Sequence, residues 1–120
     1  MATEDNCCTL VPYFRIQAGK IDAFKQLCVE FVKVTNNEPK CLFYSFSFDG
    51  DLACCLEGYV GAEGVLAHVD NVSELFPEAM KISEIERIEV HGPEQELAKL
   101  REPLAELNPQ FFVVENGFRR

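Results

Sequence analysis

Residues 41–59 read CLFYSFSFDGDLACCLEGY, an aromatic run and a second apolar run that are separated by Asp49-Gly50. Asp-Gly between two such runs is a strong signal for a β-hairpin, because the tight turn needs positive φ and these residues tolerate it. A two-residue turn also fixes the register and pairs Phe48 with Asp51. The same register pairs Phe46 with Ala53, Tyr44 with Cys55 and Leu42 with Glu57.

Alternation along the two strands divides their side chains between two faces of a sheet. One face combines aromatic rings with a carboxylate and a phenol, which is unusual for an ordinary core and typical of a pocket lining. We call it the pocket face, and its members are Tyr44, Phe46, Cys55, Glu57 and Tyr59. The opposite face carries Phe43, Ser45, Leu52, Cys54 and Leu56.

Hydrophobic periodicity predicts the elements outside the hairpin. Apolar residues recur every three or four positions over 21–34, as on one face of a helix. A leucine-rich segment near the end predicts a helix that Pro103 bends or breaks. The other expected elements are a loose tail over 1–7, a strand over 8–17, a helix over 62–72, a further helical turn or two from Pro77, and strands over 85–91 and 111–114.

The order β-α-β-β-α-β predicts an α+β fold of the ferredoxin-like, split βαβ kind, with an antiparallel sheet and helices on one face. We expect residues 1–120 to form one domain, with this core over 8–92 and a helix-and-strand extension over 93–120. The pocket face is too apolar to stand in water, so we expect a second copy of the chain to cover it. This predicts a homodimer with a cavity between the sheet and the partner or the tail.

Charge and composition narrow the classes of partner. The chain has 120 residues and a net charge of -9, from 11 basic and 20 acidic side chains. Such a surface repels phosphate, which disfavours nucleic acid and anionic membranes. The apolar runs are too short to span a bilayer, and the acidic N-terminus lacks a signal-peptide pattern. We therefore expect a cytoplasmic protein whose partners are a second copy and a small-molecule substrate.

The six cysteines predict neither disulfides nor a zinc site. Four of them form the neighbouring pairs Cys7-Cys8 and Cys54-Cys55, whose members point to opposite faces of a strand. The chain has no Cys-x-x-Cys motif and only two histidines. Free thiols used as small hydrophobic residues are the expectation, and Cys55 is not expected to act as a nucleophile.

Three short motifs together resemble the antibiotic biosynthesis monooxygenase (ABM) domain of the dimeric α-β barrel superfamily. They are NEPKCLFY at 37–44, EGY at 57–59 and EGVLAH at 63–68. The likeness covers about residues 8–92, with Lys40 where the family usually has glycine. Haem-degrading members carry a tryptophan at the place of Tyr59 and an asparagine on the first strand. This chain has neither, so haem degradation is disfavoured.

The resemblance implies a cofactor-independent monooxygenase that oxidises a planar, quinol-like or enolisable molecule with molecular oxygen and without metal or flavin. In this interpretation His68 removes a proton from the substrate, whose anion then supplies the electrons to oxygen. Two alternatives remain open. One is an isomerase or tautomerase that uses the same base, and the other is a non-catalytic, dimeric small-molecule-binding or stress-related module.

The candidate residues each have a functional and a structural interpretation. His68 titrates near neutrality, which suits proton transfer, although a lone histidine at a helix edge is also a common surface residue. Glu57 is placed to orient an imidazole or bind a substrate hydroxyl, or else to pair with Arg15 or Arg87. His91 is expected at the surface.

The aromatic candidates are Tyr44, Phe46 and Tyr59. The two tyrosines are able to bind a flat ligand by ring contact and one phenolic hydrogen bond, and we predict them as substrate-binding residues. Strand tyrosines packed in a dimer interface are the structural alternative. Phe46 is expected to form part of the wall of the cavity.

Overall fold

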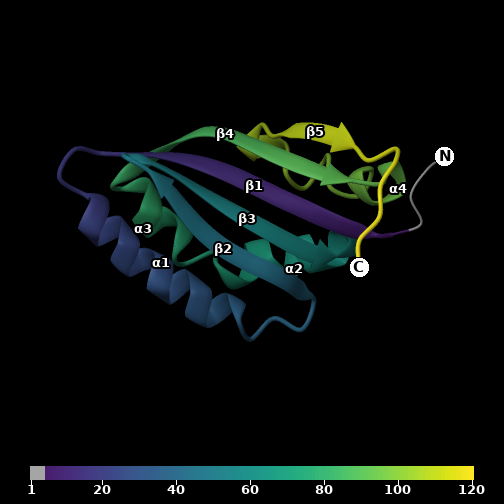
Figure 1. Cartoon of the computed structure of the whole chain (residues 1–120), viewed down its shortest axis with the longest axis horizontal. Coiled ribbons are helices and arrows are strands. Elements are labelled where there is room, and N and C mark those ends of the chain that lie inside the picture. Colours follow the sequence, from purple (N-terminus) through teal and green to yellow (C-terminus); the bar gives the residue numbers. More distant parts are fainter. Residues whose placement is uncertain (1–4) are drawn as a thin grey trace.

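The computed structural model describes residues 5–120, and its elements follow the predicted order (Figure 1). They are β1 (Cys7–Ile16), α1 (Ile21–Thr35), β2 (Cys41–Asp49), β3 (Leu52–Val60), α2 (Gly61–Asn71), α3 (Phe76–Met80), β4 (Ser83–Gly92), α4 (Glu94–Leu97), the 3₁₀ turn η1 (Ala105–Leu107) and β5 (Gln110–Val113). Most of the loose tail expected over 1–7 lies outside the described residues, and β1 already begins at Cys7.

The sheet has the strand order β2-β3-β1-β4-β5. The first four strands pair antiparallel in the split βαβ arrangement, which confirms the predicted α+β class. The fifth strand belongs to the C-terminal extension and pairs parallel to β4. Residues 93–120 therefore widen the same sheet at its β4 edge.

The hairpin between β2 and β3 is present, but its register differs by two residues from the expected one. Tyr44 lies opposite Glu57, where Cys55 was expected. Gly50 and Asp51 take the two central turn positions, and only Gly50 has positive φ, at 60°. Glycine alone enters that region without strain, so the turn centres on it as in a type II′ turn. A shift of two residues leaves every side chain on its predicted face.

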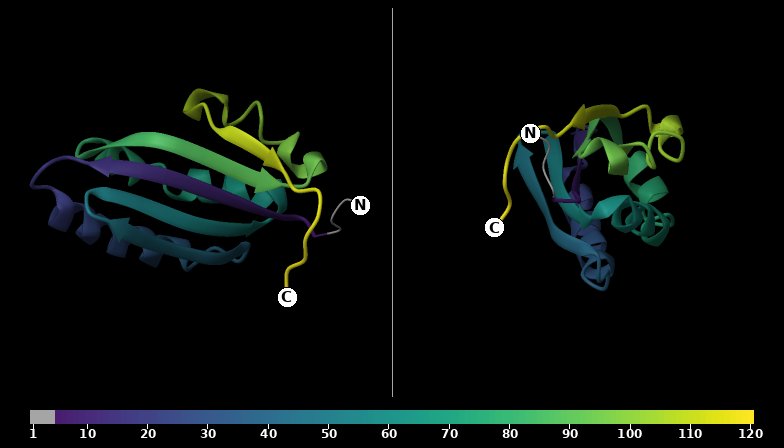
Figure 2. Two further views of the ribbon diagram at one scale, coloured as in Figure 1. Left: turned by 45° about the horizontal axis from the view of Figure 1, so that its top comes forward. Right: turned by 90° about the vertical axis from the view of Figure 1, so that its right-hand side faces the viewer.

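The pocket face is covered by the chain's own helices, and the expectation that a second copy covers it is wrong. Figure 2 shows all the helices on one side of the sheet, with the C-terminal segment on the other. The rings of Phe24 and Phe31 on α1 contact Phe46 of β2 with centroids 6.4 and 6.0 Å apart. Alternation groups residues by face but does not say on which side the helices lie.

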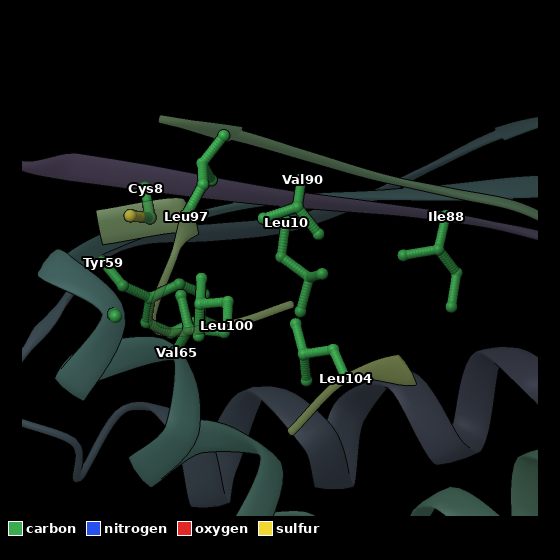
Figure 3. Packing of buried hydrophobic residues seen from close by; sticks show 10 residues of the cluster. Cys8, Leu10, Tyr59, Val65, Ile88, Val90, Leu97, Leu100 and Leu104 are labelled. Atoms are coloured by element: carbon green, nitrogen blue, oxygen red, sulfur yellow. The ribbon is translucent and has the colours of Figure 1, made fainter. Parts of the chain in front are cut away.

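Two apolar clusters fill the space between sheet and helices. The second cluster connects the C-terminal end of β1 and the N-terminal end of β3 to α1, and it includes Phe14, Phe24 and Phe31. In the first, Leu97, Leu100 and Leu104 of the extension are at most 2% exposed (Figure 3). The members of the first cluster are Cys8, Leu10, Tyr59, Ala62, Val65, Ile88, Val90, Leu97, Leu100 and Leu104. The extension is thus packed into the core.

The predicted C-terminal helix is much shorter than expected. Regular helix is limited to α4, which ends at Leu97, before Pro103; turns follow it, and η1 comes after Pro103. Pro103 lacks the N–H that a helix needs, which is consistent with the absence of regular helix around it, but the end of α4 comes earlier. Within residues 5–120, no helix has the length and apolar character needed to cross a bilayer.

The face of the sheet that points away from the helices, here called the outer face, retains exposed apolar side chains. Phe43 and Leu56 are 45% and 47% exposed. One end of this face lies under the C-terminal segment, where an ion pair joins Arg119 to Asp5 over 2.7 Å. The acidic residues of β4 are partly paired, since Glu86 contacts Arg15 at 2.8 Å.

Candidate active site between sheet and helices

A cavity of about 360 Å³ lies between the sheet, the helices α1 to α3 and residues 103–107. Most of its lining is aliphatic or aromatic, and this composition is typical of small-molecule sites. The side chains of the lining that carry polar atoms are Tyr44, Cys55, Glu57, His68, Ser73 and Glu106. Of these, Glu57 and His68 are buried ionisable groups.

Glu57 projects from β3 into the interior and is 3% exposed. The hydroxyl of Tyr59, two residues along the same face of the strand, donates a 2.6 Å hydrogen bond to its Oε1. Burial raises the pKa of the Glu57 carboxyl to about 8, while hydrogen bonds from Tyr59 and Cys55 act in the opposite direction. The carboxyl group therefore holds a proton at neutral pH and is able to donate it.

His68 projects from α2 toward the same point and is 4% exposed. Its Nδ1 lies 2.9 Å from Oε2 of Glu38, and its Nε2 lies 3.4 Å from Oε1 of Glu57. Burial lowers the pKa of the imidazole below its ordinary value, although the Glu38 carboxylate opposes this effect. The ring is neutral near pH 7 and can accept a proton, and the surface alternative for His68 is wrong.

Glu57 and His68 thus form a neutral acid beside a neutral base. Their environments move the two pKa values in opposite directions, up for the carboxyl group and down for the imidazole. In enzymes, two groups whose environments move their pKa values apart in this way are commonly the general acid and the general base. Chemically, the arrangement can remove one proton from a bound molecule and deliver another.

Tyr44 and Phe46 line the cavity next to this pair. The Tyr44 ring lies 5.2 Å from the His68 ring, measured between centroids, and 5.5 Å from Phe46. Burial raises the pKa of the Tyr44 phenol, so it stays protonated. Tyr59 is fully buried and is not part of the lining; its hydroxyl donates to Glu57, and its ring lies 5.1 Å from the His68 ring, measured between centroids.

The predicted alternative partners of Glu57 are elsewhere. Arg15 pairs with Asp51 and Glu86, and Arg87 pairs with Glu89 at 2.6 Å. Arg15 thus pairs across to β4 and to the hairpin turn, whereas Arg87 pairs within its own strand, and the alternative in which one of them pairs with Glu57 is wrong. His91 stacks on Phe112 with centroids 4.6 Å apart, at the half-exposed end of β4.

Glu38 and Asn71 complete the surroundings of the imidazole, and sequence reasoning missed both. Glu38 lies in the loop between α1 and β2, and Asn71 is the last residue of α2. The amide of Asn71 donates a 2.7 Å hydrogen bond to Oε2 of Glu38. The motif at 37–44 included this glutamate, but periodicity gives no indication of where a loop side chain points.

Within the described part of the chain, neither the cysteines nor a cluster of metal-binding side chains forms a second candidate site. Burial raises the pKa of Cys28 to about 12, so this thiol stays protonated. All six cysteines are free, as expected. No group of three or more His, Cys, Asp or Glu side chains with the spacing of a metal site occurs within residues 5–120.

The fold places the protein in a known structural class. Solved structures of candidate antibiotic biosynthesis monooxygenases from Chloroflexus aurantiacus and Caulobacter crescentus match it with TM-scores of 0.62 and 0.63. They are 19% and 20% identical, and each match covers 72% of this chain and 92% or 88% of the other. These likenesses confirm the ABM-like fold.

A much stronger likeness extends over the whole molecule. The crystal structure of MupZ from Pseudomonas fluorescens is 45% identical, with a TM-score of 0.96 over 100% of this chain and 94% of that chain. The chain therefore belongs to the same family as MupZ, and the shared structure includes the C-terminal extension. No protein-family profile matches the sequence, and no curated protein matches it.

Proposed function

We propose that this protein is an acid–base enzyme that acts on a small, largely apolar molecule without a cofactor. His68 Nε2 removes a proton from the substrate, and the Glu57 carboxyl group delivers one. The observation that carries the proposal is the 3.4 Å contact between His68 Nε2 and Glu57 Oε1 at the wall of an apolar cavity of about 360 Å³. General acid–base groups placed in this way contribute about 10²–10⁴-fold to a rate.

The paired acid and base favour an isomerisation or tautomerisation, in which the substrate loses a proton at one atom and gains one at another. The transfer leaves an imidazolium at His68 and a carboxylate at Glu57. Because Nε2 and Oε1 are neighbours, the proton passes from the imidazolium to the carboxylate and restores both groups. The cycle takes up no net proton, which suits an acid and a base that are both buried.

Oxygenation is the second candidate, and the names of the structural neighbours favour it. It needs only the base: His68 removes a proton from a quinol-like or enolisable substrate held against Tyr44 and Phe46. The substrate anion reduces molecular oxygen, one atom of which enters the product while the other leaves as water. This route gives no role to the proton that Glu57 holds, and for that reason we place it second.

Turnover with and without oxygen separates the two candidates. A panel of small quinols and enolisable ketones is incubated with the protein in air and under argon, and the products are identified by mass spectrometry. Isomerisation proceeds equally in both and leaves the mass unchanged. Oxygenation stops under argon, and in air it gives a product that has gained one oxygen atom and lost the two hydrogens that leave in the water. If His68→Gln retains full turnover, His68 is not the base. If panel compounds bind in a thermal-shift assay but none is turned over, the non-catalytic module is favoured.

We also propose that the outer face forms the contact of a homodimer. It carries Phe43 and Leu56, each close to half exposed, on adjacent strands. Apolar patches of this kind on a sheet are commonly covered by a partner. This contact lies on the opposite side of the sheet from the cavity, so the partner is not needed to enclose the substrate.

A further inference from the structure

Glu38 makes the shortest polar contact to the imidazole of His68. Its Oε2 lies 2.9 Å from Nδ1, and its side chain is 8% exposed. Since a carboxylate only accepts hydrogen bonds, Nδ1 carries the single proton of the neutral ring. The lone pair of the imidazole is then on Nε2, the atom that lies next to Glu57.

The position of Glu38 is fixed by both neighbouring helices. Asn71, at the end of α2, donates hydrogen bonds of 2.7 Å to Glu38 Oε2 and 3.0 Å to the carbonyl of Val34 in α1. The backbone N–H of Glu38 donates to the carbonyl of Thr35, the last residue of α1, over 2.9 Å. The carboxylate therefore presents a fixed acceptor to Nδ1.

The second oxygen of Glu38 is in a different situation. Glu38 Oε1 and Thr35 Oγ1 are buried, and neither has a partner in good hydrogen-bonding geometry within the described residues, although Thr35 lies near the Tyr44 phenol and acts to lower its pKa. Both residues line a pocket of about 160 Å³ beside the first half of β2, which we call the edge pocket. Tyr44 lines both the edge pocket and the larger cavity. Buried oxygens in a roomy polar site commonly bind ordered water.

We propose that Glu38 is a positioning residue for His68, and that the edge pocket binds a water molecule between Glu38 Oε1 and Thr35 Oγ1. Glu38 keeps the imidazole proton on Nδ1, so that Nε2 is always the proton acceptor. The water supplies the partner that Glu38 Oε1 and Thr35 Oγ1 otherwise lack. The kinetic consequence rests on the proposed function of His68, whereas the tautomer and the water are properties of the resting protein.

The variant Glu38→Gln tests the positioning role, because it keeps the size of the side chain and removes its charge. We expect the ¹⁵N shifts of His68 to show loss of the pure Nδ1–H tautomer. The pKa of His68 should fall further, since the carboxylate raises it in the native protein. With a substrate, kcat should fall about 10²-fold and its pH profile should shift, with little change in KM.

Glu63→Gln is the matched control, since Glu63 pairs with Lys40, is 82% exposed and does not contact His68. It should leave the ¹⁵N shifts and the titration of His68 unchanged. If Glu38→Gln also leaves them unchanged, Glu38 is not a positioning residue, even when turnover is found. If the tautomer changes while the panel yields no turnover, the positioning role stands and the proposed enzyme activity fails.

The water is tested by a crystal structure of the native protein and of Thr35→Val, which keeps the shape of the side chain and removes the hydroxyl. We expect water within hydrogen-bond distance of both oxygens in the native protein and its loss in Thr35→Val. Thr35→Ser keeps the hydroxyl and should retain the water. A native edge pocket without ordered water, or one whose water is unchanged in Thr35→Val, overturns this part of the proposal.

Discussion

The hydroxyl of Tyr59 donates a 2.6 Å hydrogen bond to Oε1 of Glu57. Tyr59 lies two residues further along β3, and its side chain is fully buried. This bond stabilises the ionised form of Glu57, although burial outweighs it. Tyr59 therefore helps to set the pKa of Glu57 and does not form part of the cavity wall.

Tyr59→Phe removes this bond without changing the packing of the ring. We expect the pKa of Glu57 to rise further, so that the alkaline limb of a pH–rate profile moves to higher pH. Leaving a buried carboxyl oxygen without its donor should cost about 1–3 kcal/mol of unfolding free energy, measured by urea denaturation. The control is Tyr13→Phe, which removes a hydroxyl from β1 on the outer side of the sheet. Equal pH profiles for Tyr59→Phe and the native protein would contradict the assignment.

Glu57→Gln replaces the proposed acid by an amide of the same shape. The amide cannot release a proton at neutral pH, so kcat for an isomerisation should fall about 10²–10⁴-fold. For an oxygenation that needs only His68, the loss should be small. The kcat values of Glu57→Gln and of the native protein, measured with the same substrate from the panel, therefore test the role of Glu57 directly. Circular dichroism checks that the variant is folded.

The raised pKa of Glu57 also predicts how stability depends on pH. The ordinary value is 4.5, and the folded value is about 8. Between these values the folded state holds a proton that the unfolded chain has released, so the free energy of unfolding should fall as pH rises. The decrease should amount to a few kcal/mol, at about 1.4 kcal/mol for each pH unit.

His68 contributes the opposite slope at lower pH. Its folded pKa is lowered from 6.5, so its contribution to stability is lost as pH falls below that value, where only the unfolded chain binds the proton. The difference between Glu57→Gln and the native protein isolates the glutamate, because His68 is present in both. Urea denaturation from about pH 5 to about pH 9 should show the variant gaining stability relative to the native protein. Parallel curves would mean that Glu57 is ionised in the fold.

Leu56→Lys places a charge in the middle of the outer face and should dissociate the proposed homodimer. Leu56 is 47% exposed in the isolated chain, so the change leaves the fold intact. Sedimentation velocity should show a monomer for the variant and a dimer for the native protein. The matched control is Val29→Lys on α1, where a 54% exposed valine lies away from the sheet, and this variant should remain dimeric. A native monomer would refute the dimer.

Much of the fold follows from local rules. The two-residue alternation correctly grouped Tyr44 and Glu57 on one face, and the register error of two residues did not disturb this grouping. The turn was displaced because only Gly50 takes positive φ, whereas the pattern Asp49-Gly50 suggested that both of its members do. The last helix was shorter than its leucine spacing suggested, since α4 ends at Leu97, before Pro103 is reached.

The side of the sheet on which the helices lie was not predictable from the hairpin alone, since both of its faces carry apolar residues. The first strand held the missing information. Leu10 pairs opposite Glu57, and Leu10, Phe14 and Ile16 alternate with the more polar Thr9 and Arg15. The apolar side of β1 is therefore the side of the pocket face. Glu38 escaped prediction for another reason: a loop has no periodicity from which its direction can be inferred.

The cavity is walled by strands and helices of a single chain, and residues 103–107 supply its last side. The sheet therefore separates a molecule bound in the cavity from a partner bound to the outer face. The proposed dimer contact and the proposed chemistry should then be removable one at a time, the first by Leu56→Lys and the second by His68→Gln.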